Sequence, residues 1–313
     1  MIGLAVADLH IRSTNPQYRI DDYPIAILKK VSFIISTANR YKASIFIAGD
    51  IFDNVRVGYK YTNKLIKILR KAKYGIYTIP GQHDQEHHEQ DMEATPYQTL
   101  IESGVIHDVN NIRIDGIFGI GWESSRPEDE TSGDVLIMHY CVTPNEPPFF
   151  LKDSASSAFE LSNRFSNWKT IICGDYHIPH IFVNKMGNKC NNLLINCGSI
   201  GRSNKDQWNH KPRVVLFDTK RPGIYKNIFI PVESSEKVFN IPDDIPINEE
   251  FSAQIKELAG ELLSKNDRPT FGNTVKFIMQ KSMASKRKID IARKFISIGN
   301  ANNGSTKRVR RIK

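Results

Sequence analysis

The sequence predicts an α/β fold in which a sandwich of two mixed β-sheets is flanked by helices and followed by a small helical appendage. Three observations support this. The first 80 residues alternate short apolar runs with amphipathic segments, later apolar runs follow one another closely, and the composition changes after residue 231. With 313 residues, 40% of them hydrophobic and 25% charged, the chain can bury a substantial core.

The N-terminal part has the pattern of a β-α-β-α-β unit. Residues 2–7, 44–48 and 76–79 are predicted strands, and residues 25–39 and 63–71 are predicted helices. The second and third strands are continuously apolar rather than alternating, which is typical of strands covered on both faces. We therefore expect helices to cover both faces of these strands.

The middle of the chain predicts a second sheet. Its apolar runs are strand-like in length and leave little room for helices between them. They are residues 112–114, 117–121, 135–139, 170–173, 193–195, 214–217 and 225–230.

The remainder of the chain has a different character. We expect one large domain over residues 1–231, followed by an acidic, proline-containing linker over residues 232–247. Asn248 can then cap a helix, so that residues 248–300 are predicted to form a helical appendage for a partner or DNA. Residues 301–313 form a polar, basic tail.

The positive charge is concentrated near the C-terminus. The net charge is +9, and residues 276–313 hold twelve Lys or Arg against one Asp, so that the rest of the chain sums to −2. We expect such a segment to bind polyanions, and nucleic acid in preference to a membrane surface. The alternative is a basic surface that is exposed to solvent and has no partner. The residues expected to contact DNA there are Lys286, Arg287, Arg293, Lys294, Lys307, Arg308, Arg310 and Arg311.

Neither the cysteines nor the N-terminus indicates secretion. The four cysteines form no C-x-x-C pair, which favours reduced thiols over a disulfide framework. The apolar residues 1–6 are too few to span a membrane and lack a basic leader. We expect a cytoplasmic protein that does not bind membranes.

Five polar motifs stand at or just beyond the ends of predicted strands, where open α/β sheets place ligand-binding residues. They are Asp8-Leu9-His10, Gly49-Asp50-Ile51-Phe52-Asp53, Gly81-Gln82-His83-Asp84, His139, and Gly174-Asp175-Tyr176-His177. Together they supply carboxylates, imidazoles and one amide carbonyl. This mixture suits Mn²⁺, Fe²⁺ or Zn²⁺ better than Ca²⁺ or a structural zinc ion.

In this order the five motifs resemble those of the calcineurin-like metallophosphoesterases. Within that superfamily, residues 1–230 look most like the SbcD-type nuclease subunit of double-strand-break repair complexes, especially the shorter phage versions. The turn from Gly198 to Arg202 resembles a Gly-Ser turn with a nearby Arg in these nucleases. The resemblance therefore implies the two-sheet sandwich of that superfamily and suggests that Arg202 contacts DNA.

The resemblance also implies a two-metal site. One metal would be held by Asp8, His10 and His177, Asp50 would bridge, and the other would be held by Gln82, His139 and Asp175. Gln82 stands where the family usually has Asn, and Asp175 where it usually has His. Both departures affect the ligands of the same metal. We therefore expect this second site to have an altered affinity for metal, or an altered metal preference that favours Mn²⁺ or Mg²⁺.

Two further residues have predicted catalytic roles. His83 is the candidate general acid for the leaving oxygen, and Asp84 is expected to orient its imidazole. Asp53 is expected to hydrogen-bond a ligand imidazole or to fix its loop.

These observations predict a metal-dependent DNA nuclease, exonuclease or endonuclease, that uses two divalent ions. Mn²⁺ is preferred, with Mg²⁺, Fe²⁺ and Zn²⁺ as alternatives. By analogy it would be the nuclease subunit of an SbcCD-like repair or recombination complex with an SbcC-like ATPase, in a bacterial or phage-infected cytoplasm, and a homodimer is left open. One alternative is a phosphatase or cyclic phosphodiesterase acting on a small molecule or protein, and another is a catalytically weakened DNA-binding scaffold.

Overall fold

The computed structural model describes residues 1–240 apart from 86–91, 123–131, 149–150, 153 and 188. The predicted appendage, tail and C-terminal DNA-contacting residues lie outside these described residues. Among the described helices, none is both long enough and apolar enough to cross a membrane.

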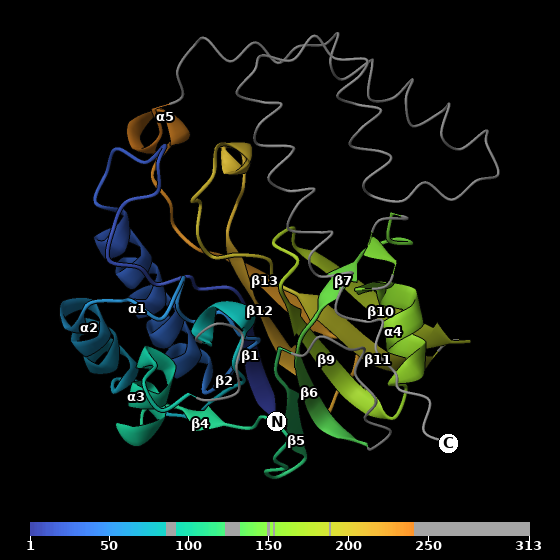
Figure 1. Ribbon diagram of the computed structural model, residues 1–313. Helices are drawn as coiled ribbons and strands as arrows, with labels where there is room; N and C mark the ends of the chain where they lie inside the picture. Colours follow the sequence, from blue (N-terminus) through green and yellow to red (C-terminus); the bar gives the residue numbers. More distant parts are fainter. Residues whose placement is uncertain (86–91, 123–131, 149–150, 153, 188, 241–313) are drawn as a thin grey trace, which may run out of the picture. The chain divides into compact units, whose positions relative to one another are not determined.

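Two large sheets dominate the described part of the chain (Figure 1). The six-stranded sheet has the order β13 (Tyr225–Phe229), β12 (Arg213–Asp218), β1 (Ile2–Val6), β2 (Ser44–Ile47), β3 (Ile76–Thr78), β4 (His107–Asp108). The five-stranded sheet has the order β10 (His180–Met186), β11 (Lys189–Asn196), β9 (Trp168–Gly174), β6 (Gly133–His139), β5 (Ile117–Ile120). A small pair is formed by β7 (Cys141–Thr143) and β8 (Ala155–Ser157).

Both large sheets are mixed. In the first, β1, β2, β3 and β4 run parallel, and β12 is antiparallel to both of its neighbours, β1 and β13. In the second, β5, β6, β9 and β11 run parallel and β10 is antiparallel to β11. Parallel strands end at a common edge, so each sheet presents several loops together at one edge.

Helices cover the outer faces of the sheets. They are α1 (Tyr23–Tyr41), α2 (Tyr59–Leu69) and α3 (Pro96–Glu102) on the six-stranded sheet, and α4 (Ala158–Arg164) on the five-stranded sheet. The single turn α5 (Ser235–Val238) lies away from the sheets and contacts Arg202 and Trp208 (Figure 1). Short 3-10 turns occur at η1 (Gln82–Asp84) and η3 (Lys205–Gln207). Helix α1 begins where the Asp22 side chain accepts a hydrogen bond from Ile25 N, and it ends at Lys42 in the left-handed conformation.

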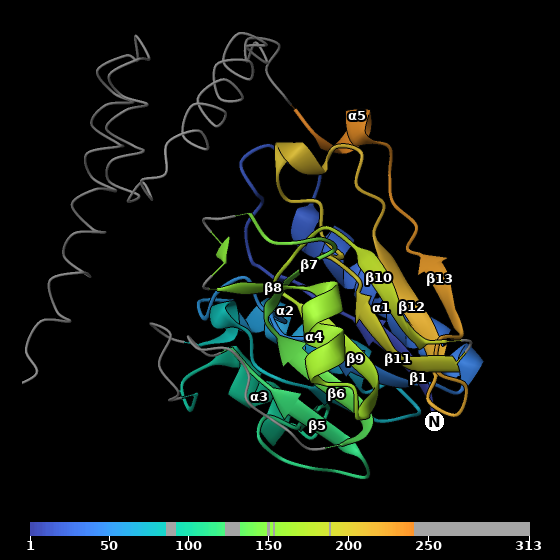
Figure 2. The same cartoon turned by 90° about the vertical axis from the view of Figure 1, so that its right-hand side faces the viewer.

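The core has three layers of apolar packing. Leu4 and Val6 of β1 pack with α1, whereas Ala5 packs between the sheets with residues such as Val135 and Ile172. A third cluster lies between the outer face of the five-stranded sheet and α4 (Figure 2). Because the central strands are covered on both faces, their buried segments, such as residues 45–48 and 135–138, are continuously apolar.

The predicted fold class is confirmed: two large mixed sheets are flanked by helices. The predicted β-α-β-α-β unit is present as β1 to β3, with α2 beginning four residues earlier than expected. Residues 112–114 do not form a regular strand, because Ile114 and Ile117 pair in a tight turn. Helices α3 and α4 were not predicted.

The compact unit extends past the expected end of the first domain. It includes Val238 and Phe239, which are only 2% and 4% exposed although the sequence predicts a linker there. Phe239 is anchored between two guanidinium groups, with Arg19 5.1 Å and Arg202 5.7 Å from its ring. The predicted domain limits as a whole stay a prediction.

Candidate metal centre

Five strand ends carry the residues that the motifs single out. Asp8 and His10 follow β1, Asp50 follows β2, and η1 follows β3 in the six-stranded sheet. In the five-stranded sheet, His139 is the last residue of β6, and the motif 174–177 begins at the end of β9. The site is therefore assembled from both sheets.

The loops that carry these residues adopt unusual backbone conformations. Asp8, His10, Asp50 and Asp175 have φ angles of 50°, 46°, 50° and 83°, in the left-handed region that non-glycine residues rarely occupy. Each such residue costs on the order of 1–3 kcal/mol and persists only where the surroundings impose it. Strain of this kind is concentrated at functional sites.

Backbone hydrogen bonds hold the strained loops together. His10 N donates to Asp50 O at 3.0 Å, and Asp8 N donates to Gly49 O at 3.3 Å. Gly81 has to be a glycine, because a Cβ there would collide with the backbone N and carboxylate of Asp50. The glycines of the motifs thus permit the close approach of the three loops.

The carboxylate of Asp50 is the centre of the arrangement. Its Oδ1 accepts a hydrogen bond from His83 N at 2.9 Å, whereas its Oδ2 is buried without a hydrogen-bond partner. Three imidazole Nε2 atoms surround this oxygen, at 3.4 Å for His139, 3.8 Å for His10 and 4.0 Å for His83. Buried polar atoms are normally satisfied, so this convergence marks a site for a cation.

The tautomer of His139 strengthens this conclusion. Its Nδ1 lies 2.8 Å from the carbonyl oxygen of Ala48, which can only accept, so Nδ1 carries the proton. A neutral His139 then directs the Nε2 lone pair at Asp50 Oδ2, and a proton or a metal ion has to separate them. Although burial opposes the charged imidazolium, the Asp50 carboxylate raises the pKa of His139 to about 10. The site thus attracts positive charge strongly.

A second group lies beside the first. His10 Nε2 and His177 Nε2 face one another at 3.1 Å, and Asp8 Oδ2 is buried without a partner. Burial raises the pKa of Asp8 to about 6 and lowers that of His10 to about 3. A neutral imidazole is the form that binds metals.

Three groups of side chains in the described residues have ligand atoms within 4.8 Å of one another. They are Asp8 with His10 and His177, Asp8 with Asp50 and His139, and His10 with Asp50 and His83. Because the groups share members, they form one continuous centre. Its imidazole nitrogens and carboxylate oxygens fit divalent ions of the Mn²⁺, Fe²⁺ or Zn²⁺ type.

Gln82 and Asp175 lie beside one another at the edge of this centre. Gln82 Nε2 donates to Asp175 Oδ1 at 3.5 Å, and both residues are half-buried. Asp175 belongs to none of the three groups, and its backbone N donates to Asp8 Oδ1 at 3.0 Å. Their roles as metal ligands stay predictions.

The hydrogen bonds of the Asp84 carboxylate are to backbone groups and not to its predicted partner, the His83 imidazole. The carboxylate of Asp84 accepts from the backbone N of Gly81 at 2.9 Å, Phe52 at 2.8 Å and Ile51 at 3.2 Å. It is fully buried and ties η1 to the loop after β2, so it does not orient the His83 imidazole. Burial, with a contribution from the Asp50 charge, raises the pKa of Asp84 to about 7.

His83 and Asp53 lie close to where their predicted roles require. The side chain of His83 is 43% exposed and its ring packs edge-on against His10 at 5.2 Å. Asp53 Oδ1 lies 3.9 Å from His10 Nδ1, and its Oδ2 lies 3.5 Å from the guanidinium of Arg12. Asp53 thus stands behind His10, although not at hydrogen-bond distance.

The turn from Gly198 to Arg202 supports the loop that carries Asp8. Ser199 Oγ and Ile200 N both donate to the carbonyl oxygen of Asp8, at 3.2 Å and 3.3 Å. Lys30 Nζ donates to Ile200 O at 2.7 Å. The sequence did not predict this support, although a lysine within the apolar face of a helix is a signal of it.

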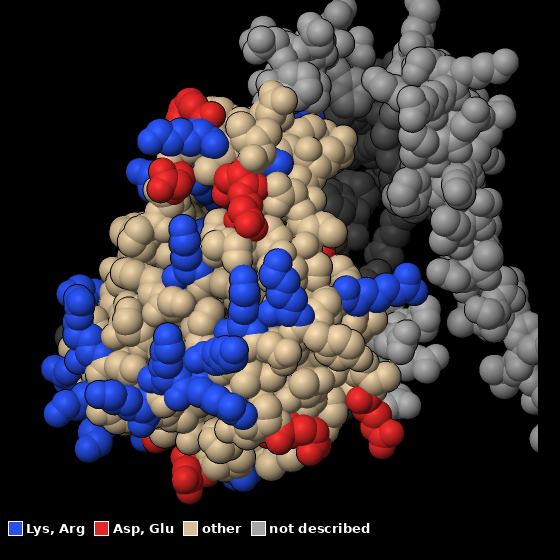
Figure 3. Space-filling model, turned by 90° about the vertical axis from the view of Figure 1, so that its left-hand side faces the viewer, with Lys and Arg blue, Asp and Glu red and all other residues tan. Residues whose placement is uncertain are grey.

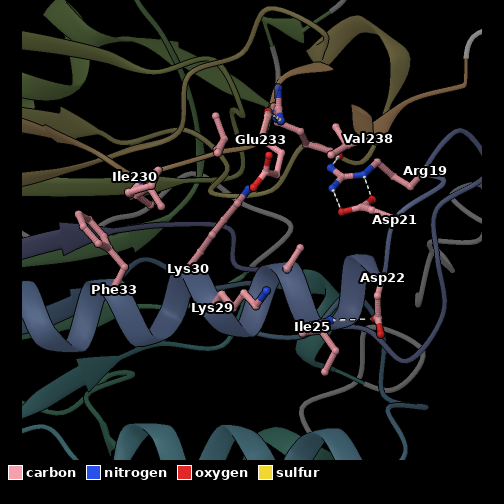
Figure 4. Close-up of a pocket in the computed structure, with 14 residues that line it drawn as sticks. Arg19, Asp21, Asp22, Ile25, Lys29, Lys30, Phe33, Ile230, Glu233 and Val238 are labelled. Atoms are coloured by element: carbon pink, nitrogen blue, oxygen red, sulfur yellow. Dashed lines mark hydrogen bonds and ion pairs between the residues drawn. The ribbon is translucent and has the colours of Figure 1, made fainter. Parts of the chain in front are cut away.

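Arg202 is not a surface residue. It is 4% exposed and its guanidinium donates to Ser235 Oγ at 3.0 Å and to the carbonyl oxygen of Glu233. Its described contacts are with the protein itself, and its contact with DNA stays a prediction. Arg202 lines a pocket of about 470 Å³ together with Arg19, Lys30 and other residues (Figure 4).

All four cysteines are free thiols, as predicted. Cys173 and Cys197 are fully buried, and Cys141 and Cys190 are half-buried. None belongs to the groups that could hold a metal.

Comparisons with known proteins give a likeness of structure only. No family model matches the chain, and no curated protein matches it. Among solved structures, the crystal structure of TT1561 of Thermus thermophilus is similar, with 10% identity and a TM-score of 0.47. The match covers 74% of this chain and 99% of that chain. The function therefore has to be inferred from the residues of this chain.

Proposed function

We propose that this chain is a metal-dependent phosphodiesterase that cleaves DNA. The observation that supports it best is the buried, unpartnered Oδ2 of Asp50 with three imidazole Nε2 atoms within 4.0 Å. The order of the five motifs, with its resemblance to SbcD-type nucleases, adds the reaction class and the substrate.

The residues of the centre have distinct roles in this proposal. Asp8, His10 and His177 would hold one divalent ion, Asp50 would contribute to both sites, and His139 with Gln82 and Asp175 would hold the second ion. Bound ions supply Lewis acidity that neutralises the phosphate and activates water.

His83 donates the proton that the leaving oxygen needs. Its imidazole is the most exposed of the rings around Asp50, and its backbone N holds Asp50 Oδ1 in place. A proton donor has to reach the substrate, and His83 at the mouth of the centre can do so.

DNA is preferred over a smaller substrate on two grounds. The chain carries a net charge of +9, which favours a polyanion, and the motif order most resembles the nuclease branch. A role beside an SbcC-like ATPase in repair or recombination, and a homodimer, belong to the same proposal. A phosphatase on small molecules and a DNA-binding scaffold are its rivals.

The test uses the full chain with Mn²⁺ or with a chelator. Linear duplex, single-stranded and hairpin DNA are compared with a chromogenic phosphodiester and a chromogenic phosphomonoester. We expect Mn²⁺-dependent cleavage of DNA and of the diester, lost in Asp50→Asn and retained in Asp134→Asn, whose carboxylate pairs with Lys169 at the surface.

Thermal unfolding gives a second readout. An ion at 100 times its Kd stabilises the folded state by about 2.7 kcal/mol, and Asp50→Asn should abolish this gain. Hydrolysis of the monoester alone would overturn DNA as the substrate. Absence of any hydrolysis together with tight DNA binding would favour the scaffold.

A further inference from the structure

The helices α1 and α2 contain basic residues and no acidic ones. From residue 54 to residue 83 the sequence has seven Lys or Arg and no Asp or Glu, and from residue 23 to residue 49 it has four and none. Lys and Arg gather on the face where these helices lie, with Asp and Glu above and below that zone (Figure 3). This uneven charge belongs to the described fold and is separate from the basic C-terminal segment.

Helix α2 has one buried face and one basic face. Its buried residues are Thr62, Leu65 and Leu69. Positions three, four and seven apart share one face of a helix, so Lys60, Lys64 and Lys67 form a row opposite that buried face. We call these three residues the α2 lysine row.

The α2 lysine row has no counter-charge in the described part of the chain. No carboxylate there lies within 4 Å of its ammonium groups, and the ring of Tyr61 lies 5.5 Å from Lys60 Nζ and 5.8 Å from Lys64 Nζ. Like charges three and four residues apart destabilise a helix, and a lysine in the first turn opposes the helix dipole. An anionic partner would offset this cost, which is modest for each like-charge pair.

The N-terminal end of α2 adjoins the metal centre. The loop from Asp50 leads into α2 within nine residues, and Gly58 N donates to Ser13 Oγ at 2.8 Å, three residues after His10. With a rise of about 1.5 Å per residue, the 11 residues of α2 extend roughly 16 Å. That length matches about five phosphates of one DNA strand at 3.4 Å each.

We propose that the α2 lysine row binds the sugar-phosphate backbone of DNA and leads it towards the metal centre. This inference rests on the proposed function. The exposed apolar side chains of α2 and its following turn are the tyrosines Tyr59 and Tyr74, whereas membrane-binding helices expose a broad aliphatic face. Tyrosine rings beside lysine side chains are typical of surfaces that bind nucleic acids, because bases stack on the rings and the lysines bind phosphates.

The test replaces the row by Lys60→Glu, Lys64→Glu and Lys67→Glu in the full chain. The matched control, Lys185→Glu, Lys189→Glu and Lys220→Glu, changes the net charge equally at exposed lysines outside α2. Binding of a fluorescent duplex is measured with Ca²⁺ over a range of salt concentrations, and hydrolysis of a chromogenic diester is measured with Mn²⁺. A second variant, with arginine at all three positions of the row, keeps the charge.

We expect the Kd for the duplex to rise at least tenfold more in the row variant than in the control. The slope of log K against log salt should fall by about 2 to 3, since each lost phosphate contact contributes about 0.9. Hydrolysis of the diester should be unchanged, and the arginine variant should bind like the wild type.

Equal loss of affinity in the row variant and the control would overturn the inference. Binding to vesicles of anionic lipid that is lost in the row variant, with DNA binding intact, would overturn it as well. A wild type that binds DNA through the row without hydrolysing the diester would reject the proposed function while leaving the row as a DNA-binding surface.

Discussion

The amide of Gln82 donates a hydrogen bond to the carboxylate of Asp175, with 3.5 Å between the two atoms. These are the two positions where the chain departs from the motifs it resembles. Gln82 is longer than the usual Asn, and Asp175 is shorter than the usual His. Their contact indicates that the two departures compensate for one another.

The first prediction concerns this pair. Gln82→Asn or Asp175→His alone should weaken the second metal, because each leaves its neighbour at the wrong distance. The double variant should recover much of the loss, so that the two effects are not additive. Titration of Mn²⁺ against the four proteins measures this. Strictly additive losses would show that the two residues act independently.

The second prediction concerns proton donation by His83. His83→Ala should retain the fold and Mn²⁺ binding but lower the cleavage rate by about 100-fold or more, because the leaving oxygen lacks its acid. Single-turnover rates and metal titration separate these effects. His107→Ala, at an exposed histidine on β4, is the control. A chromogenic substrate with an acidic leaving group should be much less affected.

The third prediction concerns Asp84. Asp84→Ala should reduce the free energy of unfolding by about 3 kcal/mol or more, because three buried backbone N–H groups lose their acceptor. Chemical denaturation measures the loss. Asp206→Ala, at an exposed carboxylate, should change stability by no more than about 0.5 kcal/mol. A small effect at Asp84 would mean that η1 is held by other contacts.

The fourth prediction concerns the pH dependence that Lys30 introduces. Burial, with the charges of Arg202 and Arg19, lowers the pKa of Lys30 from 10.5 to about 7. Between these values the unfolded chain binds the additional proton, so stability should increase with pH from about 7 to about 10. The contribution to the slope is at most about 1.4 kcal/mol per pH unit.

Lys30→Met should remove this part of the slope, whereas Lys29→Met, at an exposed neighbour, should leave it unchanged. Denaturation at several pH values in a metal-free buffer compares the three proteins. An identical slope in all three would show that Lys30 stays protonated in the folded state.

The sequence predicts the sheets better than the short helices. Apolar runs such as residues 135–139 identify strands because both faces of β6 are buried. Helices α3 and α4 have seven residues each, which is too few to establish a helical period. Thr95 caps the start of α3 and Ser157 caps the start of α4. These capping residues are the local sequence signal of the two helices.

The sequence motifs also predict which polar residues form the centre, but they do not predict the residues that support these side chains and loops. His139 and Asp50 stand in motifs whose spacing follows from strand ends. The contacts of Arg202 with Ser235 and Glu233, and those of Asp84 with Ile51 and Phe52, join residues 31 to 33 positions apart and depend on tertiary packing. Adjacency in sequence made Asp84 look like a partner of His83.

The metal centre draws its members from both sheets, Asp8 and Asp50 from one and His139 and His177 from the other. An ion bound between them would act as a cross-link across the seam of the sandwich. The ion would then add a polar connection to the apolar packing between the two sheets. Removal of such an ion would be expected to lower the stability of the packing between the two sheets.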